Sequence, residues 1–95
     1  MSTKKFWLSY DCDGEDCSNY DDIYHWLREH QSIECGNSVA FVQNYNYNGD
    51  FIEAITTEIK KIPHLNRAYI MYRDDALKTY GKFIIGQRKN NNPWD

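Results

Sequence analysis

The sequence predicts one small domain of the α+β class, and three observations support that prediction. The chain has 95 residues, which is typical of one domain and leaves no room for a second. Short runs rich in aromatic and β-branched residues have the composition of strands. Two further stretches have the apolar spacing of amphipathic helices. We expect residues 1–95 to form a single domain with a flexible tail at 90–95.

The first part of the chain predicts a strand and then a helix. Residues 6–10, Phe-Trp-Leu-Ser-Tyr, are aromatic-rich and are followed by an acidic loop, which is typical of a strand. Ser18 and Asn19 offer a helix N-cap, and acidic residues follow in the first turn, where they suit the helix dipole. Apolar residues at helical spacing then predict a helix over 20–30.

The next segment predicts a hairpin. Two short extended runs, 32–35 and 38–42, flank the pair Gly36-Asn37, which suits a two-residue turn. The second run is apolar on both faces, so we expect it to lie inside the sheet.

The second half predicts a helix and two strands. Asp50 can cap the helix, and Glu53 completes a capping box. Pro63 ends the helix. Residues 68–72 and 82–87 then read as strands, with Gly81 in the loop before the last one. The apolar stripe of the helix consists of Ile52, Ile55, Ile59 and Ile62.

The order is therefore strand, helix, strand, strand, helix, strand, strand. Its first six elements have the split βαβ pattern of ferredoxin-like folds. We expect a ferredoxin-like βαββαβ sheet with an additional C-terminal strand and with the two helices on one face. The other face is left to water or to a partner.

The first and fourth strands are apolar or aromatic on both faces. A large exposed apolar patch usually marks a contact. We therefore expect a homodimer that packs through the open face, with Trp7, Tyr69 and Met71 in the interface. In the alternative, the last strand and the tail cover these side chains.

The composition and charge of the chain argue against some classes of function, namely general nucleic-acid binding and membrane contact. The net charge is −3, which argues against general affinity for phosphate backbones. Residues 1–53 contain ten acidic and three basic residues, whereas residues 54–95 contain four acidic and eight basic residues. No apolar run has transmembrane length, and no apolar signal segment follows the first residues. We expect a cytoplasmic protein without membrane contact.

The topology resembles that of the small CRISPR-associated spacer-acquisition subunit and of SinR-like proteins. In those families the first strand often ends in a Tyr-Asp pair, as residues 6–11 do here, and residues 38–41 resemble their hairpin. The resemblance implies a two-fold dimer in which the last strand can lie against the partner chain. It also implies that Asp11 takes the place of an acidic metal ligand used in phosphodiester hydrolysis. The arginine cluster that many members carry after the first strand is missing here.

The acidic loop after the first strand is a candidate metal site. Asp11 and Asp13 lie near Gly14, and hard cations such as Mg²⁺ or Mn²⁺ prefer several carboxylate oxygens. The spacing does not match an EF-hand loop. A solvated turn that caps the following helix is the alternative.

Basic and aromatic residues near the end of the chain are a candidate nucleic-acid patch. Bases can stack on such rings while cations hold the phosphates. A solvated edge strand, protected from aggregation by its lysines, is the alternative. The predicted patch comprises Lys78, Tyr80, Lys82, Arg88 and Lys89.

These features favour a small homodimeric interaction module in a nucleic-acid or defence-related process, and we lean away from an enzyme. The first alternative is an endonuclease, a ribonuclease or deoxyribonuclease, that uses Asp11 and a divalent metal. The second is an acidic inhibitor that mimics DNA through the carboxylates of the first half.

Overall fold

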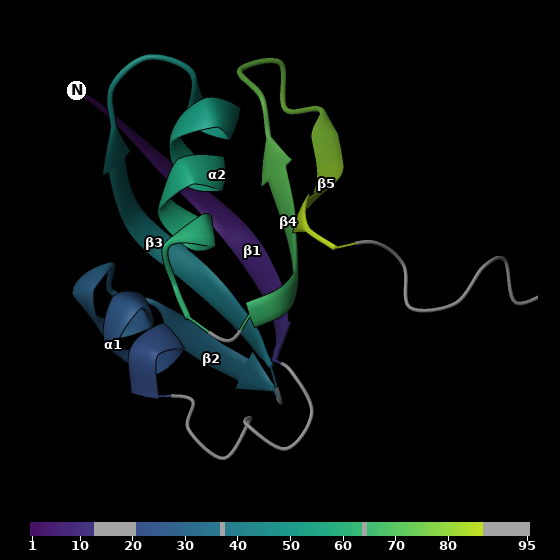
Figure 1. The fold of residues 1–95 in the computed structure, drawn as a ribbon. Helices are drawn as coiled ribbons and strands as arrows, with labels where there is room; N and C mark the ends of the chain where they lie inside the picture. The colour runs from purple at the N-terminus through teal and green to yellow at the C-terminus, as the bar shows by residue number, and fades with distance from the viewer. Residues whose placement is uncertain (13–20, 37, 64, 87–95) are drawn as a thin grey trace, which may run out of the picture.

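The computed structural model describes residues 1–12, 21–36, 38–63 and 65–86 (Figure 1). Two helices and five strands follow one another in the predicted order, and the α+β class is confirmed. In the described part of the chain, no helix is long and apolar enough to span a membrane. The strands are β1 Ser2–Cys12, β2 Ile33–Gly36, β3 Val39–Tyr47, β4 Leu65–Arg73 and β5 Thr79–Ile85, and the helices are α1 Asp21–Glu29 and α2 Phe51–Lys60.

All five strands form one antiparallel sheet in the order β2-β3-β1-β4-β5. Strand β1 is central and pairs with β3 on one side and with β4 on the other. Strands β1 and β2, which α1 connects, lie on either side of β3. Strands β3 and β4, which α2 connects, lie on either side of β1. The chain thus consists of two interleaved units, with β5 added at the edge beside β4.

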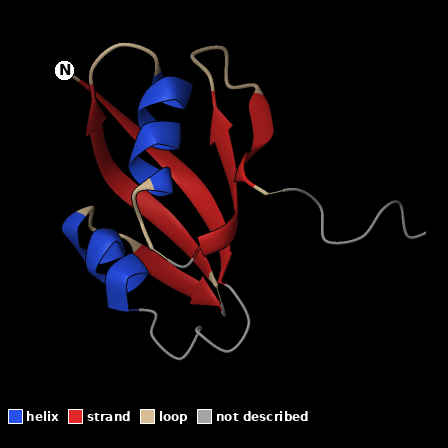
Figure 2. Ribbon diagram, in the orientation of Figure 1, coloured by secondary structure: helices blue, strands red, loops and turns tan. Residues whose placement is uncertain are grey.

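Both helices pack on the same face of the sheet (Figure 2). Alternation along each strand sends every second side chain towards them. Phe6 of β1 contacts Phe51 of α2, and Tyr45 of β3 contacts Trp26 of α1. The central buried residues of this core are Phe6, Leu8, Val42, Ile55, Ile59 and Ile70.

Asp50 caps the start of α2, as predicted. The Oδ2 atom of Asp50 accepts a hydrogen bond from the Glu53 backbone N–H at 3.0 Å, and Asp50 has extended backbone angles. Of the predicted apolar stripe, Ile55 and Ile59 are fully buried. The helix ends at Lys60, before Pro63.

The last strand begins earlier than predicted. Gly81 lies inside β5, opposite Met71, and not in the preceding loop. A glycine is tolerated there because the ring of Tyr69 lies across it and fills the space of the missing side chain. The end of the predicted strand, residue 87, and the predicted tail at 90–95 lie outside the described residues.

Candidate interaction surface

The face of the sheet opposite the helices, called here the open face, carries a continuous row of apolar side chains. Ile33 of β2 lies opposite Phe41 of β3, which lies opposite Trp7 of β1, and Trp7 lies opposite Met71 of β4. Ile33, Trp7 and Met71 are 51%, 44% and 42% exposed. We call these four residues the apolar row. Four neighbouring strands thus present one hydrophobic stripe to solvent.

A second row of side chains runs beside the apolar row. Val39, Ser9, Tyr69 and Phe83 lie opposite one another across β3, β1, β4 and β5. The ring centroids of Tyr69 and Phe83 are 4.8 Å apart. A shallow hollow of about 200 Å³ lies between the two rows and is lined by Trp7, Ser9, Val39, Tyr69 and Met71.

The structure brings together the three residues predicted for a dimer interface. Trp7, Tyr69 and Met71 all line that hollow. Strand β5 extends the sheet at its edge beside β4, and its Gly81 and Phe83 contact the Tyr69 ring, whereas Trp7 and Met71 stay exposed. The alternative in which the last strand covers some of these side chains therefore holds in part for Tyr69, and the tail lies outside the described residues. The homodimer itself stays a prediction.

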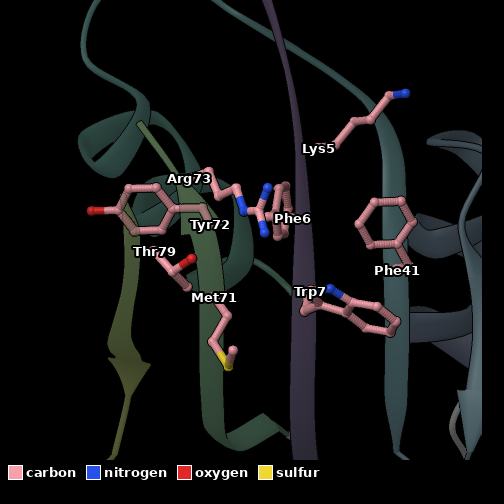
Figure 3. Close-up of a pocket in the computed structure, with 8 residues that line it drawn as sticks. All are labelled: Lys5, Phe6, Trp7, Phe41, Met71, Tyr72, Arg73 and Thr79. Atoms are coloured by element: carbon pink, nitrogen blue, oxygen red, sulfur yellow. The ribbon is translucent and has the colours of Figure 1, made fainter. Parts of the chain in front are cut away.

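A second hollow, of about 430 Å³, lies on the side of the apolar row away from the first hollow (Figure 3). Lys5 of β1 and Arg73 of β4 flank it, and the rings of Trp7 and Phe41 border it. We call this hollow the cationic groove. Neither Lys5 nor Arg73 pairs with a carboxylate within residues 1–12, 21–36, 38–63 and 65–86. The lining residues are Lys5, Phe6, Trp7, Phe41, Met71, Tyr72, Arg73 and Thr79.

Asp11, the predicted metal ligand, forms an ion pair. Its Oδ2 atom accepts a hydrogen bond from Nη2 of Arg67 on β4 at 2.5 Å, and both side chains are partly exposed. Asp13, the second predicted ligand, lies outside the described residues. Among the residues that are described, no three histidine, cysteine or acidic side chains come together as a metal site. The metal site and the nuclease stay predictions.

The predicted nucleic-acid patch is described in part. Tyr80 and Lys82 of β5 lie opposite Tyr72 and Ile70, which face the helices, so both are on the helix side of the sheet. The hydroxyl of Tyr80 donates to Oδ2 of Asp74 at 3.2 Å, and this hydrogen bond raises the pKa of Tyr80. Lys78 lies in the turn before β5. Arg88 and Lys89 lie outside the described residues.

Three residues of the cationic groove, namely Lys5, Phe41 and Arg73, were not predicted from the sequence. The signal for two of them was present as strand alternation. Lys5 lies two residues before Trp7, and Arg73 lies two residues after Met71, so each shares a face with a predicted interface residue. Phe41 could be placed only when β3 was known to be the neighbour of β1.

Searches of protein-family models, of curated proteins and of solved structures gave no match to this chain. Its function is therefore inferred from the geometry of the open face.

Proposed function

We propose that this protein is a homodimeric interaction module in which two copies pack through their open faces. The apolar row is the observation that carries the proposal. Trp7 and Met71 are exposed side by side at its centre, and aromatic residues and methionine are enriched in protein interfaces. A face with contiguous apolar side chains on four strands is costly to leave in water, and a second copy would cover it.

We further propose that the fold is ferredoxin-like, with β5 as an additional C-terminal strand. The support is the arrangement in which β1 and β2 flank β3 while β3 and β4 flank β1. In such an arrangement both connecting helices occupy one face and the other is free for a partner. The Tyr10-Asp11 pair near the end of β1, which runs to Cys12, is the residue pattern on which a defence-related process is proposed.

Sedimentation velocity over a wide concentration range tests the dimer. The wild-type protein is expected to sediment as a dimer, and Met71→Glu as a monomer, because the substitution places a charge in the centre of the apolar row. Leu77→Glu is the matched control, since Leu77 is 71% exposed in the β4–β5 turn. It introduces the same charge in a turn that is not part of the apolar row and should leave the dimer intact. A wild-type protein that is monomeric at every concentration contradicts the proposal.

A further inference from the structure

We infer that the cationic groove binds a nucleotide unit of single-stranded nucleic acid, with the base against Trp7 and Phe41 and the phosphate at Lys5 and Arg73. This inference goes beyond the proposed dimer and does not depend on it. It rests on the charge and the rings of the groove, and not on the predicted patch around Lys82.

The two rings provide a stacking surface. Trp7 and Phe41 come from neighbouring strands, and their ring centroids are 4.9 Å apart. Trp7 is nearly half exposed, so part of its indole surface is free to contact a ligand. Aromatic side chains on an open sheet face stack bases of any sequence, because every base has a flat π-face.

The charges around the groove are of one sign. Lys5 and Arg73 are both exposed cations without a carboxylate partner in the described ranges, and none of the described residues that line the groove is acidic. Arg73 lies opposite Thr79, whose hydroxyl can also donate a hydrogen bond. A ligand that complements the charge of the groove is therefore an anion. The guanidinium of Arg73 suits a phosphate in particular, because guanidinium and phosphate groups form paired hydrogen bonds.

The shape of the groove favours one unit of a chain. Its volume of about 430 Å³ is within the range of small-ligand sites. Its lining side chains come from four neighbouring strands, β3, β1, β4 and β5 (Figure 3), so a bound strand of nucleic acid would cross the sheet. Duplex DNA would not fit this mode, because its bases are already stacked and paired.

The groove and the proposed dimer surface share Trp7 and Met71. A nucleic-acid strand and a second copy would therefore compete for these side chains. Such competition predicts that single-stranded nucleic acid shifts the monomer–dimer equilibrium towards the monomer. The size of the shift depends on how much more tightly the monomer binds the strand than the dimer does.

Fluorescence anisotropy with labelled oligothymidylate and oligouridylate tests the inference. Lys5→Gln/Arg73→Gln is expected to weaken binding at least about tenfold and to flatten the salt dependence, which has a logarithmic slope of about −0.7 per phosphate contact with single strands. Lys78→Gln/Lys82→Gln is the matched control, because it removes the same charge outside the groove. Trp7→Leu should weaken binding, whereas Trp7→Phe should keep most of it. Circular dichroism checks that each variant is folded.

Several outcomes would overturn the inference. These are no binding by the wild-type protein, an equal loss in the control pair, equally tight binding of a duplex, or equally tight binding of free uridine monophosphate. Sedimentation of the same samples separates the two proposals. If the protein binds single strands but never dimerises, only the proposed dimer is contradicted. If it dimerises but binds no single strand, only the proposed nucleotide site in the cationic groove is contradicted.

Discussion

Arg67 and Asp11 are direct cross-strand neighbours on β4 and β1, and the guanidinium donates to the carboxylate at 2.5 Å. The pair joins residues that are 56 positions apart in the sequence. It gives Asp11 a structural role at the end of the central strand. Because the guanidinium of Arg67 is already paired with Asp11, it is less available to a ligand than the cations of Lys5 and Arg73 are.

The ion pair predicts a measurable but small coupling energy. Asp11→Asn, Arg67→Gln and the double variant form a double-mutant cycle, read by urea unfolding. We expect a coupling of about 0.5–1 kcal/mol, because both side chains are partly exposed and water screens their attraction. Additive effects of the two single variants would contradict an ion pair in solution.

The same pair predicts how the protein responds to divalent cations. A metal ion at Asp11 must displace the guanidinium of Arg67, so removing Arg67 should strengthen any metal binding there. We expect Mn²⁺ to raise the Tm of Arg67→Gln more than that of the wild type. Asp11→Asn/Arg67→Gln is the control and should lose the response. A larger response of the wild-type protein would mean that Arg67 supports the metal site.

Gly81 predicts a local rearrangement on substitution. A β-carbon at this position would lie 1.6 Å from the hydroxyl oxygen of Tyr69, so Gly81→Ala must push the Tyr69 ring off β5. We expect destabilisation on the order of 1 kcal/mol and altered NMR shifts of the Phe83 ring, which the Tyr69 ring contacts. Gly36→Ala is the control, because nothing lies within 4 Å of its added carbon. Unchanged shifts at Phe83 would show that Tyr69 does not occupy this position.

Truncating the isoleucine side chains of α2 to alanine is expected to lower the free energy of unfolding by amounts that depend on how deeply each side chain is buried. Ile55→Ala should lower the free energy of unfolding by about 2–5 kcal/mol, because the side chain is fully buried and leaves a cavity. Ile52 is only half-buried on the same helix, so Ile52→Ala is the matched comparison and should cost less. Equal losses in chemical denaturation would mean that the helix packs with a different face on the sheet.

Tyr45 predicts a loss of stability at alkaline pH. Burial, and secondly the charge of Glu58, raise the pKa of Tyr45 above its ordinary value of 10.0. The folded state therefore holds this proton more tightly than the unfolded state. The stabilisation is complete below pH 10.0 and is lost as the pH rises through the folded-state pKa.

The measurement is the free energy of unfolding between neutral pH and the alkaline limit. Tyr45→Phe keeps the ring but removes the ionisable hydroxyl, so its stability should fall less steeply above pH 10.0. Tyr72→Phe is the control for removing one phenol from the same aromatic cluster. The prediction fails if the Tyr45→Phe curve parallels that of the wild-type protein.

Local signals in the sequence were sufficient for the element order. The aromatic run of β1, the Asp50 cap and the isoleucine stripe of α2 are properties of short segments, and each is present as predicted. The start of β5 could not be predicted. Whether Gly81 belongs to a strand depends on Tyr69, which lies on the neighbouring strand and covers it.

For the candidate site, too, local patterns could be predicted from the sequence, whereas contacts between strands could not. Alternation within β1 and β4 placed Trp7 and Met71 on one face. The partnership of Asp11 with Arg67 depends on the strand order of the sheet, which no local pattern contains. The cationic groove depends on it too, because Phe41 and Arg73 line it from β3 and β4, which lie on opposite sides of β1.

The central position of β1 also constrains how the protein can be made. Of the five strands, β1 is synthesised first, yet its second neighbour, β4, is complete only at Arg73. Until then, the nascent chain holds an aromatic strand with one unpaired edge, a state that favours aggregation. A fragment that stops before β4 cannot pair that edge, so the sheet is completed only after β4 has been synthesised. Translation speed through residues 65–73 is therefore expected to influence the yield of native protein.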